Sequence, residues 1–221
     1  TTAANWEGDA VPDLASGLTH LVFATAGTSA QVTDPVRAWG LTFRAANDFA
    51  LTARDAGSVL SLGLGGITLQ DDPQETIAAD WRYVRLGVSL DLTADQTWDL
   101  SANVKRRLQL EAPLSGDAAR TLTITGAGAL GLVAASDFAG NVVVKGGVMK
   151  ILAKERPFGR ADAGGTVLVD QTAGAQWNQF DATVDKPLVV VGGNRHWQDF
   201  YTSSVDGVTT NVFSASFTVR G

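Results

Sequence analysis

Apolar and polar residues alternate with a period of two along most of the chain. In the clearest example, residues 84–92, Val84, Leu86, Val88, Leu90 and Leu92 would share one face of an extended segment. Similar short runs recur at 20–25, 40–45, 48–53, 59–69, 97–100, 107–114, 121–125, 141–147, 166–171 and 187–193. A half-buried β-strand has this period, so the sequence predicts an all-β fold built from many short strands.

The breaks between these runs indicate how the strands are connected. The chain has 24 glycines but a single Asn-Gly or Asp-Gly pair of the kind that closes tight hairpins, Asp206-Gly207. Most breaks instead hold closely spaced glycines, as at 63–66, 126–128 and 146–147. Glycine allows sharp bends and close approach of two backbones. Among a sandwich, a barrel and a solenoid, these corners favour the solenoid.

One segment, residues 121–151, resembles a known motif, the autotransporter-associated β-strand repeat. Its first part is matched by Leu122, Gly126, Gly128, Leu130 and Leu132, and its second part by Phe138, Gly140, Val142, Val144, Gly147, Met149 and Ile151. The sequence departs from the family pattern near Thr125 and at Val148-Met149, and neither change disturbs the alternation. Weaker similarity extends over roughly residues 1–177.

The resemblance implies a right-handed parallel β-helix of the kind found in large exported surface proteins of Gram-negative bacteria. We therefore expect residues 1–186 to form a parallel β-helix with an N-terminal cap region. Residues 187–221 are expected to add a C-terminal β-segment, either a hairpin or an extra strand, that serves as a cap or an assembly strand. An extracellular or cell-surface location follows from the same resemblance.

The two ends of a solenoid need partners because each exposes unpaired backbone groups. At the start, Trp6 is a candidate plug over the first coil. Near the finish lies a group of candidate capping or assembly aromatics, namely Trp197, Phe200, Tyr201, Phe213 and Phe217. They either cover the last rung or help the chain to join a second copy by strand addition. A homo-oligomer or polymer formed through the ends is the expected partner.

Composition and charge exclude several classes of partner. There are 17 Lys and Arg against 23 Asp and Glu, a formal net charge of -6, which argues against nucleic acid. The densest basic run, Lys105-Arg106-Arg107, is interpreted as a solvated turn. Cysteine is absent, and no uncharged stretch approaches the roughly 20 residues that span a bilayer. No membrane span is therefore expected.

Candidate catalytic groups are few, and each has a simpler explanation. Two groups of carboxylates, Asp71-Asp72-Glu75 and Asp181-Asp185, are interpreted as solvated loop or turn-capping residues. The lysines near Asp137, which are Lys145, Lys150 and Lys154, are interpreted as outward strand positions. His20 and His196 lack a second imidazole at ligand spacing. The sequence therefore predicts no enzyme activity, no cofactor and no metal site.

Together these features predict a non-enzymatic structural module of a secreted or cell-surface bacterial protein. A self-assembling extracellular fibre subunit, joined by strand addition and with a role in adhesion, is one version of it. The alternative is a β-helix that binds or cleaves carbohydrate, with a surface glycan as partner. In that case Trp81, Trp177 or Trp197 would provide exposed stacking platforms for sugar rings.

Overall fold

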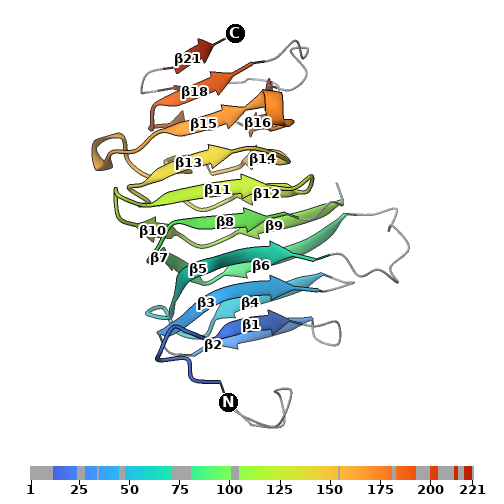
Figure 1. The fold of residues 1–221 in the computed structure, drawn as a ribbon, viewed down its shortest axis with the longest axis vertical. Helices are drawn as coiled ribbons and strands as arrows, with labels where there is room; N and C mark the ends of the chain where they lie inside the picture. The colour runs from blue at the N-terminus through green and yellow to red at the C-terminus, as the bar shows by residue number, and fades with distance from the viewer. Residues whose placement is uncertain are drawn as a thin grey trace.

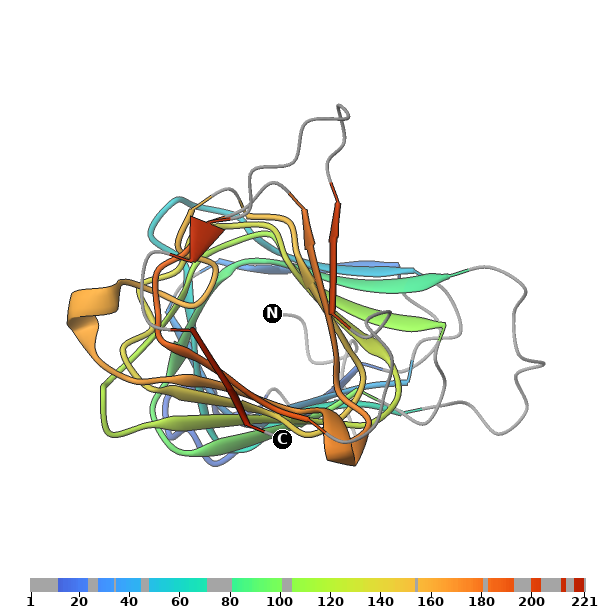
Figure 2. The same ribbon diagram turned by 90° about the horizontal axis from the view of Figure 1, so that it is seen from above.

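The computed structural model of the chain describes residues 12–23, 28–33, 35–44, 48–70, 81–100, 105–153, 155–180, 183–192, 200–203, 212–213 and 217–220. Within these ranges the strands stack into a column that rises from the N-terminal to the C-terminal end (Figure 1). Seen from above, the chain traces a closed outline around a central core (Figure 2). Two long sheets, sheet A and sheet B, form most of this outline.

Sheet A follows the strands β1 (His20–Phe23), β3 (Val36–Phe43), β5 (Val59–Leu69), β8 (Gln96–Asp99), β11 (Thr121–Thr125), β13 (Asn141–Val144), β15 (Val167–Asp170), β18 (Leu188–Val191) and β21 (Phe217–Arg220), in that spatial order. The strand β7 (Ser89–Leu92) pairs with β5 and with β10 (Leu114–Gly116). Sheet B follows β2 (Ser29–Val32), β4 (Phe49–Ala53), β6 (Arg82–Gly87), β9 (Arg106–Leu110), β12 (Ala129–Leu132), β14 (Val148–Ile151), β16 (Gln176–Phe180) and β19 (Phe200–Ser203). A short third sheet pairs β17 (Thr183–Val184) with β20 (Val212–Phe213), and two 3-10 helices, η3 (Ala161–Ala163) and η4 (Gln171–Ala173), lie at corners.

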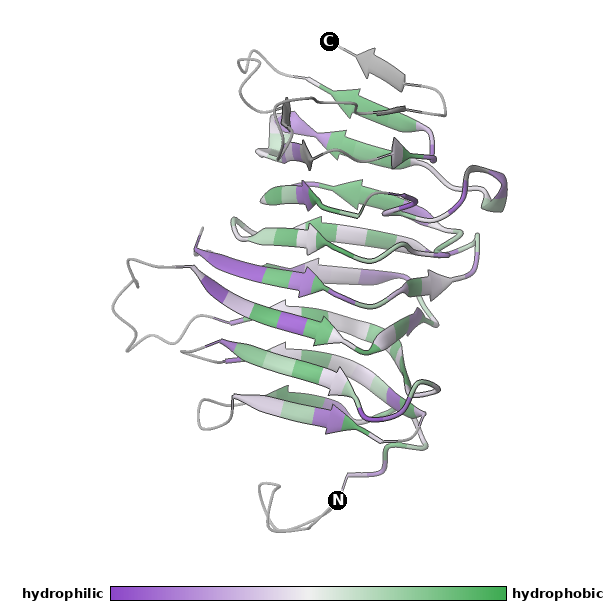
Figure 3. Ribbon diagram, turned by 180° about the vertical axis from the view of Figure 1, so that it is seen from behind, coloured by the Kyte–Doolittle hydropathy of each residue, from purple (hydrophilic) through white to green (hydrophobic). Residues whose placement is uncertain are grey.

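All strand pairs among the described residues are parallel. Sheet A, nearest the viewer in Figure 1, points to the right, and sheet B also points to the right when the molecule is seen from behind in Figure 3. Because the chain rises between these passes, the coil is right-handed. The predicted all-β, right-handed parallel β-helix is confirmed, and the sandwich is excluded.

Inward side chains stack in columns because the rungs are in register. One column on sheet A runs through Leu21, Leu41, Ile67, Trp98, Ile124, Val144, Val169 and Val190. A column on sheet B runs through Phe49, Val84, Leu108, Leu130, Met149 and Trp177. All of these side chains are buried. Each contributes roughly 1.5–3 kcal/mol by leaving water, so the two columns supply much of the stability.

Two polar side chains inside the core form hydrogen bonds there. Gln96 is buried, its Nε2 donates to the Leu62 carbonyl at 2.7 Å, and its Oε1 accepts from Trp98 Nε1 at 3.0 Å. Lys186 is 1% exposed, and its Nζ donates to the Gly140 carbonyl at 2.6 Å. Burial lowers the pKa of the Lys186 amine to about 8. Gln96 therefore supports the tryptophan that interrupts the aliphatic column, while Lys186 carries the cost of a buried charge.

The glycines of the repeat lie at corners where the backbones touch. A Cβ on Gly128 would lie 2.2 Å from the Leu100 carbonyl oxygen, and one on Gly147 would lie 2.4 Å from the Gly128 carbonyl oxygen. Gly147 also has a φ of +70°, which side chains rarely adopt. Among the other repeat positions, Leu130, Leu132 and Phe138 are buried in the core, while Gly126 and Gly140 form further corners.

The described C-terminal strands extend the solenoid. β19 pairs with β16, β20 with β17 and β21 with β18, all in parallel, so this region contributes extra strands and not a hairpin within the described ranges. Sheet A continues from β15 to β18 across the expected boundary at residue 186. Phe200, Tyr201, Phe213 and Phe217 belong to these strands. Trp6, Trp197 and Asp206-Gly207 lie outside the described residues, and the cap and assembly roles stay predictions.

Candidate functional site on the outer face of sheet B

The outer face of sheet B carries a concentration of cationic and aromatic side chains. On β6 and β9 the inward positions are Val84, Leu86 and Leu108, so the alternating pleat turns Tyr83 and Arg107 outward. Hydrophilic positions gather on these two strands when the sheet is viewed face-on (Figure 3). The core pattern therefore determines which residues form this surface.

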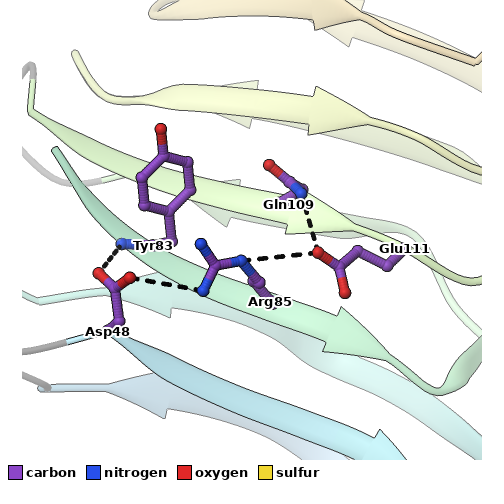
Figure 4. Close-up of polar contacts among 5 residues, drawn as sticks. All are labelled: Asp48, Tyr83, Arg85, Gln109 and Glu111. Carbon is purple, nitrogen blue, oxygen red and sulfur yellow. Dashed lines mark hydrogen bonds and ion pairs between the residues drawn. The ribbon is translucent and has the colours of Figure 1, made fainter.

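One part of the surface is a row, the Arg85 row, in which Arg85 lies between Asp48 and Glu111 (Figure 4). The Arg85 guanidinium lies 3.4 Å from Asp48 Oδ2 and 3.6 Å from Glu111 Oε1. Gln109 Nε2 donates to Glu111 at 2.8 Å, and the Tyr83 backbone N–H donates to Asp48 at 2.9 Å. These side chains are about a third to a half exposed, and water screens such pairs. This row orders the surface without adding net positive charge.

Beside it lies a second group, Trp81, Tyr83, Arg107 and Lys150, which we call the cation–aromatic cluster. The Arg107 guanidinium carbon lies 4.8 Å from the centroid of the Trp81 ring and 4.9 Å from that of Tyr83. Lys150 Nζ lies 4.9 Å from the Trp81 ring, and Lys105 Nζ lies 5.8 Å from it. At these distances each cation is attracted to the negative face of the ring. One indole therefore holds several cations together.

Small outward residues on β12 make this arrangement possible. β12 lies between β9 and β14, and in the register Ala129 follows Arg107 while Gly131 precedes Lys150. A Cβ at Gly131 would already lie 3.8 Å from Arg107 Cδ. Ala129 faces outward yet is fully buried, which shows that longer neighbours cover it. The side chains of Arg107 and Lys150 thus reach one ring across an intervening strand.

The two cations also affect each other. Desolvation by partial burial lowers the pKa of the Lys150 amine, and the positive charge of Arg107 lowers it further. Desolvation lowers the pKa of Arg107 as well, with an opposing contribution from Tyr83. The protein therefore holds two repelling positive charges near each other at a partly desolvated position.

A groove of about 420 Å³ adjoins the cluster at the corner between the sheets. Its lining is Trp81, Lys105, Gly126, Ala127, Gly146, Gly147, Val148, Ala173, Gly174 and Gln176. Three successive corners contribute small residues to its floor, so the groove runs across several rungs. Trp81 and Lys105 provide its aromatic and cationic groups.

The structure corrects two sequence interpretations at this surface. Trp177 is fully buried in the inner column of sheet B, where it stacks 5.6 Å from Phe158, so it is not a platform for sugars. The basic run at 105–107 is not simply a solvated turn, because Arg106 is buried and Arg107 is an outward strand residue. Trp81 does line the groove, as the carbohydrate alternative requires.

The other candidates are dispersed or lie outside the described residues. Asp137 forms an ion pair with Arg156 at 3.5 Å, and Lys145 is exposed beyond β13. His20 shares a 2.8 Å hydrogen bond with Thr42, and burial lowers the pKa of its imidazole. Asp185 is half-buried beside β17. The candidates outside the described ranges are Asp71, Asp72, Glu75, Lys154, Asp181 and His196.

Among the described residues, no group of three or more His, Cys, Asp or Glu side chains is placed to hold a metal ion. Within the same residues, no helix has the length and hydropathy needed to cross a membrane. The fold and this surface together define a parallel β-solenoid with one cationic, aromatic flank. Comparison with protein-family models, curated proteins and solved structures found no match. Membership of the autotransporter repeat family accordingly stays a hypothesis.

Proposed function

We propose that this chain is a non-enzymatic structural module of a secreted or cell-surface bacterial protein, and that copies of it join end to end by strand addition. The observation that carries the proposal is the unbroken parallel path of sheet A from β1 to β21. A column of stacked aliphatic side chains supports a rod along its length. The bacterial surface location rests on the resemblance of residues 121–151 to the exported repeat.

The C-terminal edge of sheet A supports the strand-addition part of the proposal. Among the described strands, β21 pairs with β18 alone and is the outermost strand of that sheet. The outer N–H and C=O groups of such an edge can pair with a strand of another copy. A second solenoid added in register would continue the same columns.

Two adjacent proline substitutions test this edge sharply. Backbone N–H groups of neighbouring residues in a strand point to opposite sides, so of Thr218 and Val219 one faces β18 and the other faces away. Proline removes the N–H group. The substitution that removes the N–H facing β18 should lower stability. The substitution that removes the N–H facing away should abolish assembly and leave the unfolding of the single chain like that of the parent.

Sedimentation velocity and negative-stain microscopy of the parent, both proline variants and a chain lacking residues 207–221 provide the readout. Thr123→Lys, in the middle of the outer face of sheet A, is the control for lateral association. The proposal predicts linear polymers for the parent and Thr123→Lys, and their loss in the truncated chain. Assembly that is the same in every variant, or a parent that stays monomeric at high concentration, would contradict it.

Glycan binding is the second candidate function, and the position of Trp81 in the groove favours it. Aromatic rings provide flat apolar surfaces against which sugar rings pack. Cleavage is tested separately by a reducing-end assay on polysaccharides. Activity lost in Asp72→Ala would overturn the non-enzymatic assignment.

A further inference from the structure

We propose that the cation–aromatic cluster binds the acidic residues of a polysaccharide, with the carboxylates of the sugar chain accepting hydrogen bonds from Arg107 and Lys150. This inference rests on the second candidate function and specifies its ligand chemistry. It is independent of whether the chain assembles into fibres. Three properties of the surface support it: unbalanced charge, an aromatic wall and an elongated groove.

Two neighbouring cations of this acidic protein lack a carboxylate partner among the described residues. Arg85 has Asp48 and Glu111 within 3.6 Å, whereas no ion pair joins Arg107 or Lys150 to a carboxylate among the described residues. Both cations lie against aromatic rings instead. Desolvation and, after it, the positive charge of Arg107 lower the pKa of Lys150, and an anion between the two cations would offset their repulsion. The site is thus complementary to negative charge.

The rings hold these cations in place before any ligand arrives. Arg107 contacts both Trp81 and Tyr83, so its long side chain is restricted to one region of the surface. A cation that is already ordered loses less conformational entropy when it binds an anion. This favours recognition of a carboxylate over nonspecific attraction.

The groove favours a sugar polymer over a small anion or a nucleic acid. Trp81 is part of the lining, and small residues from three successive corners also line the groove, so the recess is longer than one anion. Sugar rings are of the same order of length as the strand spacing of about 4.8 Å, so successive residues of a glycan would follow successive rungs. Nucleic acid binding needs a broad basic surface, which a chain of net charge -6 does not favour.

Isothermal titration with polygalacturonate as the acidic probe and dextran as the neutral one tests the proposal. The variants are Arg107→Gln with Lys150→Gln, Trp81→Leu, and a Lys150→Arg variant that keeps the charge. Lys145→Gln, which removes an exposed lysine beyond β13, is the matched control. Thermal unfolding of each variant confirms that the solenoid is intact. Titration with inorganic phosphate shows whether a lone anion suffices.

We expect polygalacturonate to bind and dextran not to bind. The double substitution should weaken binding at least about tenfold, which corresponds to ~1.4 kcal/mol, while Lys145→Gln and Lys150→Arg stay within about twofold on the same scale. Binding should vanish in about 1 M salt, where the screening length falls to about 3 Å.

Four results would overturn the proposal in distinguishable ways. Equal binding of dextran and polygalacturonate, dependent on Trp81, would leave glycan binding intact and refute the acidic specificity. Equal losses in Lys145→Gln and in the double variant would refute the site. No binding of either polymer, or phosphate binding as tight as that of polygalacturonate, would refute the polysaccharide ligand and leave the assembly assay as the independent test of the structural role.

Discussion

The outer faces of the two long sheets differ, although their inner faces are alike. On sheet A, the outward residues from β8 to β15 are mostly Thr, Asn, Asp and aliphatic, as at Thr97, Thr123 and Val143. On sheet B, the strands from β6 to β14 present Tyr83, Arg107 and Lys150. Both sheets bury stacked apolar side chains. The same coil therefore carries a plain face and a chemically specific one.

This difference separates two roles of the alternating pattern. Inward positions must match the rungs above and below, which restricts them to side chains that stack. Outward positions are free of that requirement, so binding groups can be placed there without disturbing the core. Substitutions on the two sides of one strand should consequently have effects of different size and kind.

Trp98 and Thr97, which are neighbours on β8, should show the largest contrast. Trp98 is fully buried in the column of sheet A, whereas Thr97 faces water. Trp98→Ala should lower the free energy of unfolding by about 3–5 kcal/mol, since it opens a cavity and leaves Gln96 without its donor. Thr97→Ala should change it by less than about 0.5 kcal/mol. Urea unfolding of both variants checks this, and equal effects would contradict the inward and outward assignment.

Two corner glycines, both with left-handed backbone angles, separate conformational strain from crowding. A Cβ on Gly147 would lie 2.4 Å from the Gly128 carbonyl, whereas one on Gly174, with φ +94°, would meet nothing within 4 Å. Gly174→Ala should cost about 1–2 kcal/mol from the backbone angle alone. Gly147→Ala should cost about 2–5 kcal/mol because backbone must also move. Thermal unfolding that ranks them in the reverse order would show that the rungs are not in contact there.

The buried amine of Lys186 should make the stability of the protein depend on pH. Its pKa is lowered from 10.5 to about 8 by burial, so between these values the unfolded chain binds more protons than the folded one. Stability should therefore rise with pH over that window, by at most ~3 kcal/mol. At pH 7 the cost of the buried charge is present in full. Lys186→Met should remove the rise. Chemical denaturation of the parent and the variant at pH 7.5 and at pH 9.5, both within about 1.5 units of the folded pKa, measures this difference.

Lys145→Met is the control for that experiment, because Lys145 is exposed. It should leave the increase in stability with pH in place. A parent protein whose stability is flat or falls between the two pH values would contradict the burial of the Lys186 amine.

The smallest effect is expected on the Arg85 row of sheet B. Arg85 pairs with Asp48 and Glu111 at partly exposed positions. Arg85→Gln should cost less than about 1 kcal/mol, and the loss should shrink in about 1 M salt because screening weakens the parent pairs. Chemical denaturation at two salt concentrations measures this. A loss as large as that of Trp98→Ala would mean that the outer face also determines stability.

The sequence was sufficient to predict the coil. Period-two runs and closely spaced glycines predicted a solenoid, and residues such as Leu130 and Met149 lie in the inner column of sheet B. The position of Trp177 could have been predicted from the alternating pattern. Its neighbours Gln176 and Asn178 are polar, so Trp177 occupies an inward position of the strand. An aromatic residue suggested a surface platform for sugars, but the alternation of polar and apolar residues indicates that this side chain points into the core.

The cation–aromatic cluster was only partly foreseeable. Trp81 could be singled out as an aromatic residue. Arg107 and Lys150, however, are far apart in sequence, and they meet because β9 and β14 pair with the two sides of β12. The available signal was the small size of Ala129 and Gly131 on the strand between them. Recognising it requires knowing which residues are in register, and alternation alone does not determine register.

In-register stacking is tested most directly by distances between spin labels along one outward column of sheet A. The chain has no cysteine, so labels can be attached at Thr97 together with Val143, Leu168 or Val189, which lie on the same column. Electron paramagnetic resonance should give distances that increase by about 4.8 Å with each further rung. Distances that stay constant or decrease from Val143 to Val189 would contradict the parallel solenoid.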